Sequence, residues 1–253
     1  MLVNRDHELF EKVIKNYWDY YKELEGEFLS IRRYVDFLEK NHNAFSVEFL
    51  KLFQAVCSEI DVLGKAMAQI ANSGFSKKDE NSNITKWWTF IQNEYTIAEG
   101  PLTQFNQSIK PVQVPLQEYK CFLLGDYEVQ PWKGFVTEQY ENTKKAICYR
   151  NISGSQTPSW WREYNAVKHN RITINEQDTN YEKANLGNVI KAFSALYILE
   201  RALMDTVGTR DDLESFIDYS LLFVKKRRLT YGEMDKLYGI DINGIYEDGI
   251  TGE

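Results

Sequence analysis

The stretch Pro158-Ser-Trp-Trp-Arg-Glu-Tyr-Asn-Ala-Val-Lys-His-Asn-Arg171 combines aromatic, basic and imidazole side chains at helical spacing. The proline restricts the residue before it, and Ser159 is suited to cap a first turn, so the pattern predicts a helix that begins here. Positions seven apart on a helix lie almost in line, two turns apart. Arg162 and His169 have this separation, so we expect a polar line along one side.

The other side chains of this segment divide into two groups by their helical position. Asn165 and Ala166 lie between Arg162 and His169 on the same side, which adds a carboxamide to the guanidinium and the imidazole. The opposite face carries side chains that we expect to anchor the helix in a core: Trp161, Tyr164 and Val167. The segment therefore predicts a polar site on a rigid helix.

Composition limits the class of protein. The chain has 253 residues, of which 43% are hydrophobic and 14% aromatic, so it can bury a substantial core. A net charge of −7 argues against general adhesion of the whole surface to nucleic acid or anionic membrane. The three cysteines have no metal-binding spacing, and we interpret them as reduced thiols: Cys57, Cys121 and Cys148.

The sequence predicts a cytoplasmic protein that does not cross a membrane. The first seven residues contain no apolar run that could serve as a signal peptide. No segment approaches the roughly 20 apolar residues that span a bilayer. The most apolar one, residues 189–204, is interrupted by Lys191, Glu200 and Arg201.

Apolar residues recur every three or four positions in several segments, which predicts helices there. Ser46 is a suitable cap for the clearest of them, and the cluster Asn41-His-Asn43 predicts a turn with His42 in solvent. Together with the opening stretch, the predicted helices are residues 5–40 with a break or bend at Gly26, residues 46–70, residues 84–97, residues 186–204 with a stop at Gly208, and residues 211–224.

Residues 99–158 differ in character from the rest of the chain. They contain all five prolines and show little helical periodicity. Residues 119–124 and 127–129 are short β-prone runs, and Gly125-Asp126 between them predicts a hairpin turn. We interpret this region as a partly β or irregular insertion that Trp132 and Phe135 pin against a helical body.

These elements predict a mainly α fold, a helical bundle with a proline-containing insertion. Residues 1–225 are expected to form a single helical domain, interrupted by the insertion at about 99–158. Residues 226–253, with several glycines and an acidic end, are expected to form a C-terminal tail. The cations from Lys225 to Arg228 suit either the end of the last helix or an RNA-binding patch.

Several kinds of site are missing from the sequence. There is no Walker-type loop, no dinucleotide-binding glycine motif and no serine nucleophile elbow. His7, His42 and His169 lie far apart, and none has a metal-ligand partner at helical spacing. The sequence therefore predicts neither a metal site nor a cofactor.

The remaining chemistry is that of Arg162 with His169. An imidazole titrates near neutral pH, so it can accept a proton from a ribose 2′-hydroxyl or return one to a leaving 5′ oxygen. A guanidinium can hold a phosphate through two parallel hydrogen bonds. Asn165 and Lys168 are placed to orient the scissile group, and Arg171 adds a further cation. This set of residues predicts metal-independent cleavage of RNA.

An arginine, a spacer of four to six residues and a histidine on a helix resembles the motif of the HEPN superfamily. The motif here is Arg162-Glu-Tyr-Asn-Ala-Val-Lys-His169, with a spacer of six, and Glu163 fits the polar residue that commonly follows the family's arginine. The resemblance covers the helical body, residues 46–224 without the insertion. It implies a metal-independent endoribonuclease of toxin–antitoxin or phage-defence type, an antitoxin or defence-system partner, and a homodimer with a composite site.

Two alternatives stay open at this point. Arg162 and His169 could form a buried hydrogen-bonded network, with Trp160 and Trp161 filling the core. The helical dimer could also be a non-catalytic module, like other members of the superfamily, that binds a nucleotide, RNA or a protein partner. The direction of the two side chains separates these cases, because a site for RNA has to face solvent or a dimer cleft.

Overall fold

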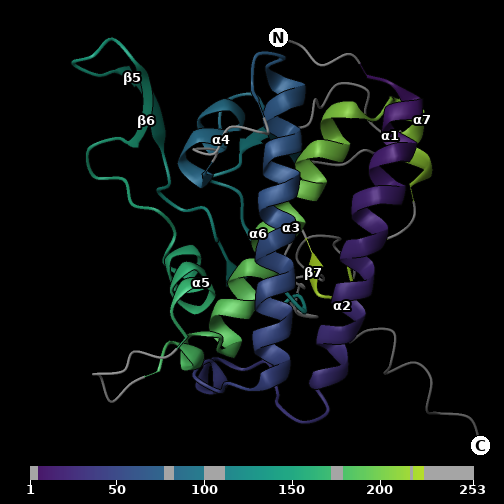
Figure 1. The fold of residues 1–253 in the computed structure, drawn as a ribbon. Helices are drawn as coiled ribbons and strands as arrows, with labels where there is room; N and C mark the ends of the chain where they lie inside the picture. Colours follow the sequence, from purple (N-terminus) through teal and green to yellow (C-terminus); the bar gives the residue numbers. More distant parts are fainter. Residues whose placement is uncertain (1–4, 77–82, 100–111, 172–178, 217–218, 225–253) are drawn as a thin grey trace, which may run out of the picture.

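A computed structural model describes residues 5–76, 83–99, 112–171, 179–216 and 219–224. The long helices run side by side (Figure 1). They are an N-terminal helix made of α1 (His7–Val13), the π-helical turn η1 (Ile14–Trp18) and α2 (Asp19–Ile31), then α3 (Val47–Ala71) and α6 (Leu186–Val207). The shorter helical elements are η2 (Glu39–Asn41), α4 (Ile84–Ile91), α5 (Ser159–His169), η3 (Asn180–Lys183) and α7 (Arg210–Ser215).

The described strands form three small antiparallel sheets. The first pairs β1 (Thr96–Glu99) with β2 (Val112–Pro115). The second places β3 (Cys121–Leu123) between β4 (Tyr127–Val129) and β7 (Phe223–Val224), so that the end of the described chain joins an internal hairpin. The third pairs β5 (Thr137–Glu141) with β6 (Ile147–Asn151).

The prediction of a mainly α helical bundle is wrong. About 54% of the described residues are helical, and the seven strands make this a mixed α/β fold. The strands have two to five residues each. In such short segments, the alternation of apolar residues that marks a strand cannot be distinguished from the spacing that marks a helix. Two strands, β1 and β7, come from segments that the apolar spacing assigned to helices.

Several predicted helices are shorter than expected. The segment 5–40 is helical only to Ile31, and Gly26 lies inside α2 without breaking it. The helix predicted for 84–97 ends at Ile91, and the one predicted for 211–224 ends at Ser215. Helix ends depend on caps and tertiary pairing, which the periodicity of apolar residues does not encode. The predicted tail and the cations 225–228 lie outside the described residues.

Other local predictions are confirmed. The Ser46 hydroxyl accepts a hydrogen bond from the Phe49 backbone N–H at 3.1 Å and caps α3 as expected. Gly208 ends α6. The predicted hairpin forms, with Cys121 opposite Val129 across β3 and β4.

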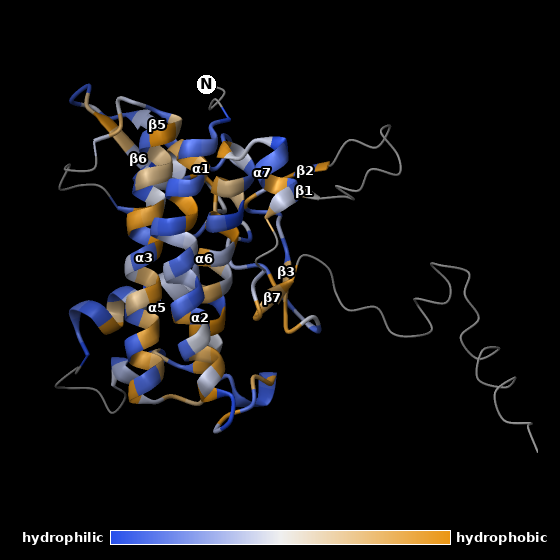
Figure 2. Ribbon diagram, turned by 90° about the vertical axis from the view of Figure 1, so that its right-hand side faces the viewer, coloured by the Kyte–Doolittle hydropathy of each residue, from blue (hydrophilic) through white to orange (hydrophobic). Residues whose placement is uncertain are grey.

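Helix α6 is the centre of the molecule. Residues 192–200 are all buried, so this helix is covered on every side rather than along one stripe. Both views place α3 alongside it (Figures 1 and 2). Because a fully enclosed helix has no face for solvent, a polar side chain on it must find a partner or remain unsatisfied.

An aromatic cluster attaches the segment between β4 and β5 to the helices. Trp132 and Phe135 are fully buried, which confirms the predicted pins. The Trp132 ring stacks on Trp88 with centroids 4.4 Å apart, and its N–H donates to the Ala195 carbonyl of α6 at 3.4 Å. Trp160 at the start of α5 donates to the Pro131 carbonyl at 3.0 Å. These contacts fix α5 against the body of the protein.

A buried carboxylate holds β7 in place. Glu25 of α2 is fully buried, and its Oε1 accepts hydrogen bonds from the Tyr21 hydroxyl at 3.0 Å, the Ser220 hydroxyl and the Leu222 backbone N–H at 3.0 Å. Its Oε2 lies 2.8 Å from the Lys22 ammonium. The carboxylate is thus hydrogen-bonded through Oε1 and ion-paired through Oε2, and it ties the last described strand to the N-terminal helix.

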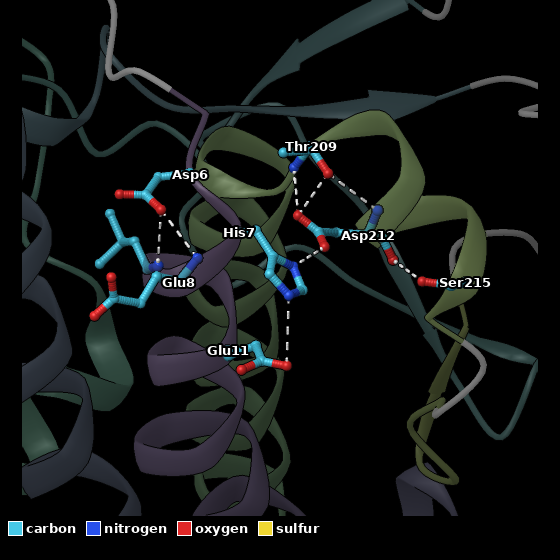
Figure 3. A network of polar contacts seen from close by, with 8 residues as sticks. Asp6, His7, Glu8, Glu11, Thr209, Asp212 and Ser215 are labelled. Atoms are coloured by element: carbon cyan, nitrogen blue, oxygen red, sulfur yellow. Dashed lines mark hydrogen bonds and ion pairs between the residues drawn. The ribbon is translucent and has the colours of Figure 1, made fainter.

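The start of α1 is joined to α7 by His7 and Asp212 (Figure 3). The His7 Nδ1 lies 2.5 Å from Asp212 Oδ1, and Asp212 also accepts two hydrogen bonds from Thr209 in a capping box. Hydrogen bonding to Asp212 raises the pKa of His7. Burial raises the pKa of Asp212, but the hydrogen bonds from Thr209 and His7 outweigh it and lower that pKa.

A Gly64→Ala substitution is expected to destabilise the protein by about 1–3 kcal/mol, the usual cost of overpacking. A Cβ at Gly64 would lie 2.7 Å from Trp87 Cε3, and the Trp87 ring cannot move freely because its N–H donates to Asp61 at 3.1 Å. Urea unfolding measures the change. Gly26→Ala is the matched control: no atom lies within 4 Å of the new Cβ, and alanine should stabilise α2 by about 0.5–1 kcal/mol. Equal effects of the two substitutions would contradict the packing.

A His7→Ala substitution is expected to lower stability more near pH 5 than near pH 8.5. The pKa of His7 is raised on folding, so its ionic contribution is complete below its unfolded pKa of about 6.5 and is lost as pH rises through the folded value. Urea unfolding at both pH values tests this. His169→Ala should change stability little at either pH, because no described residue pairs with that imidazole. A loss from His7→Ala that does not depend on pH would show that the charge does not contribute.

Candidate functional site

Helix α5 begins where the sequence predicted and lies against α3, η3 and α6. Its N-cap position is Pro158, and no side chain caps the first turn, so the predicted cap at Ser159 is wrong. Ser159 is instead the first helical residue. The fixed φ of proline, −49° here, therefore sets the start of the helix without a capping hydroxyl.

The two faces of α5 are divided as predicted. Trp161, Tyr164 and Val167 are 6%, 5% and 0% exposed and anchor the helix in the core. Arg162 and His169 are exposed on the opposite face, and no described residue hydrogen-bonds or ion-pairs with either side chain. The alternative of a buried Arg162–His169 network is therefore wrong.

The distance along the helix limits what Arg162 and His169 can do together. Seven residues correspond to about 10 Å along the axis. The two side chains point the same way. Because of this separation, they can contact two successive groups of a bound polymer more readily than they can both contact the same atom.

The other predicted site residues do not all join this line. The Lys168 ammonium lies 5.5 Å from the centre of the Tyr164 ring, and an Arg171 Nη2 donates to Gln54 of α3 at 3.2 Å. Both cations are thus turned towards α3. Asn165 is half-buried between the two faces. The structure brings these three residues to the same helix but not to one point.

The surface around α5 is locally basic although the chain is acidic. The one carboxylate on the helix, Glu163, lies 3.1 Å from the Lys183 ammonium of η3 and is neutralised by it. Arg162, Lys168 and Arg171 add three positive charges within ten residues. A polyanion would therefore meet a favourable local potential here.

A pocket of about 360 Å³ lies at the start of α5 and was not predicted from the sequence. Two lysines, Lys133 and Lys191, are among its lining residues and add positive charge at this end of α5. Its lining residues come from four separate segments of the chain, so no local pattern marks it: His42, Tyr127, Glu128, Val129, Gln130, Pro131, Lys133, Pro158, Ser159, Trp160, Gly187, Ile190 and Lys191.

The prediction that His42 is solvated is wrong. Its ring meets Tyr127 edge to face with centroids 5.3 Å apart, and its Nε2 is buried with no hydrogen-bond partner among the described residues. Burial lowers the pKa of His42, so the imidazole is neutral at neutral pH. It can contribute a hydrogen bond to the pocket but not a charge.

Metal-ligating and thiol groups do not gather near α5. Within the described ranges, no three His, Cys, Asp or Glu side chains lie close enough to hold a metal ion. The three cysteines are unpaired, and burial raises the pKa of the Cys57 thiol well above its usual value.

Comparison with known proteins finds no match. No protein-family model, no curated protein and no solved structure is similar to this chain. Among the described helices, none has both the length and the apolar character needed to cross a membrane.

Proposed function

We propose that the outer face of α5 binds RNA and cleaves it without a metal ion. The observation that carries the proposal is the exposure of Arg162 and His169 on one line of the helix, with no described partner for either side chain. Exposed and unpaired groups of this kind are free to meet a substrate. The aromatic anchors on the buried face hold the helix that presents them.

The chemistry follows from the two side chains. A neutral imidazole accepts the proton of a 2′-hydroxyl, the 2′ oxygen attacks the adjacent phosphorus, and the 5′ oxygen leaves with a proton. The products are a 2′,3′-cyclic phosphate and a 5′-hydroxyl end. The guanidinium of Arg162 binds the phosphate as its negative charge increases.

The reaction needs a base and an acid, and one His169 cannot be both in the same instant. In a homodimer whose α5 helices face each other, the partner's His169 would supply the second proton transfer. Such a pairing also brings two basic surfaces to the same RNA. The lysines of the pocket at the start of α5, Lys133 and Lys191, extend that surface beyond the helix.

One observation favours a second function, binding of RNA or a nucleotide without cleavage. A catalytic imidazole is usually oriented by a third group, and no described residue hydrogen-bonds to His169. In this case the same face binds phosphate through Arg162 and the lysines, and His169 adds only a hydrogen bond.

We expect the purified protein to cleave a fluorophore–quencher RNA in the presence of EDTA. His169→Ala should lower the cleavage rate by roughly 10²- to 10⁴-fold, the usual contribution of general acid–base catalysis, while binding persists. Arg162→Ala should weaken both binding and cleavage. The matched control is Arg210→Ala, which removes an exposed arginine on α7, far from α5 (Figure 1).

The outcomes separate the two functions. Salt-dependent binding that Arg162→Ala weakens, with no cleavage by the parent protein, would support the binding module and contradict the nuclease. If Arg210→Ala has the same effect as Arg162→Ala, or if the protein neither binds nor cleaves RNA, the outer face of α5 is not an RNA site. Circular dichroism of each variant shows whether the fold is intact.

A further inference from the structure

Glu200, in the middle of α6, is a buried acid without a partner. It is 0% exposed, and neither of its carboxyl oxygens has a hydrogen-bond partner among the described residues. Buried polar groups are nearly always satisfied, so such a group needs an explanation. Glu25 in the same protein shows the usual solution, with three donors and an ammonium around one carboxylate.

The groups that face Glu200 come from the two neighbouring helices. Glu59 of α3 and Tyr17 of η1 both interact with it electrostatically, and both are partly buried. The adjacent cation, Arg201, is engaged elsewhere, with its Nη2 3.2 Å from Asp205. Two carboxyl groups and a phenol therefore share this region, and no cation of the described residues forms a hydrogen bond with the Glu200 carboxyl.

Burial raises the pKa of Glu200 well above its ordinary value, and the proximity of Glu59 raises it further. Burial also raises the pKa of Glu59. Burial and the nearby carboxyl group therefore favour the protonated form of Glu200 in the protein without a ligand, because an isolated carboxylate in this environment is costly.

A groove of about 540 Å³ reaches Glu59, while Glu200 is buried and is not among its lining residues. It lies between the N-terminal helix and α3, and Leu203 of α6, about one helical turn beyond Glu200, is one of its lining residues. Glu59 and Tyr17 line it directly. The other lining residues are mostly apolar, with three polar ones among them: Leu9, Lys12, Val13, Asn16, Val62, Ala66, Gln69 and Ile70.

The N-terminal helix is π-helical at this level. Residues Ile14–Trp18 form the turn η1 between two α-helical segments, and Tyr17 lies within it. A π-helical turn is less stable than an α-helical one and is often found at functional sites. The only cation that lines the groove among the described residues, Lys12, is already paired with Glu8 at 2.6 Å.

We propose that this groove binds an alkylammonium ligand, with the ammonium at Glu59, next to the buried Glu200, and the hydrocarbon chain along the apolar lining residues. Charge complementarity selects a cation, because both carboxyl groups can ionise once a positive charge is beside them. The apolar wall selects an organic cation, since Leu203, Val13 and Val62 offer no ligands to a hydrated metal ion. The site lies on the opposite side of α3 from α5 and is independent of the RNA proposal (Figure 1).

Binding of this kind releases a proton. The O–H bond of the Glu200 carboxyl breaks, its proton passes to solvent, and the resulting carboxylate attracts the ammonium that lies at Glu59. Affinity should therefore rise with pH until it passes the pKa of Glu200 in the empty protein or the pKa of the amine. Glu59 on α3 and Tyr17 on η1 are the titratable groups that modulate this dependence.

Isothermal titration calorimetry of the full chain with n-hexylammonium tests the proposal. We expect binding near pH 7.5 with proton release, seen as different heats in phosphate and Tris buffers. Glu200→Gln should weaken binding by about tenfold or more, because it removes the charge and keeps the shape. 1-Hexanol, which has the same hydrocarbon chain and no charge, should bind correspondingly more weakly.

Glu138→Gln is the matched control, because it neutralises an exposed carboxylate on β5, away from the groove. It should bind hexylammonium like the parent. Equal affinity of the parent for hexanol and hexylammonium, equal affinity of Glu200→Gln and the parent, or no binding of millimolar hexylammonium would each overturn the proposal. The buffer dependence in the parent protein is a separate test, because it needs no variant to fold, and an absence of proton release would overturn the proposal as well.

Discussion

The complete enclosure of α6 is the constraint on which the rest of the structure depends. Residues 192–200 have no exposed face, so each surrounding element is placed by what it has to cover. Helix α3 packs along one side, the N-terminal helix along another, and Trp132 reaches the α6 backbone from the segment before β5. The burial of so much apolar surface provides the main favourable free energy of folding. It also makes any polar group costly when the elements packed around α6 leave that group without a hydrogen-bond partner.

The two fully buried glutamates show how this penalty is met in different ways. Glu25 is surrounded by donors, and its carboxylate joins β7 to the N-terminal helix. Glu200 has no described donor and lies near Glu59, which makes ionisation costly in the empty protein. The first arrangement contributes to the fold. The second leaves a buried carboxyl group without a hydrogen bond, which is why we assign it to the binding of a cation.

Helix α5 represents the opposite case, an element held at the edge of the core. Its buried face is fixed by indole and phenol rings, and the indole N–H of Trp160 reaches the Pro131 carbonyl. Its outer face needs no partner for stability. Arg162 and His169 therefore add nothing to the packing that the structure shows, and their arrangement is available for a substrate.

The sequence by itself determined the local features: the helix of α3 with its Ser46 cap, the existence of helix α6, the β3–β4 hairpin, and the two faces of α5. Each of these follows from spacing, a cap or a turn within a few residues. Only the tertiary structure decided the rest. Strand β7 exists because it pairs with β3 about a hundred residues earlier, and the acid pair of Glu200 and Glu59 arises where two helices meet. Contacts between distant residues leave no periodic signal in the chain, so the mixed α/β fold and the groove could not be derived from the sequence.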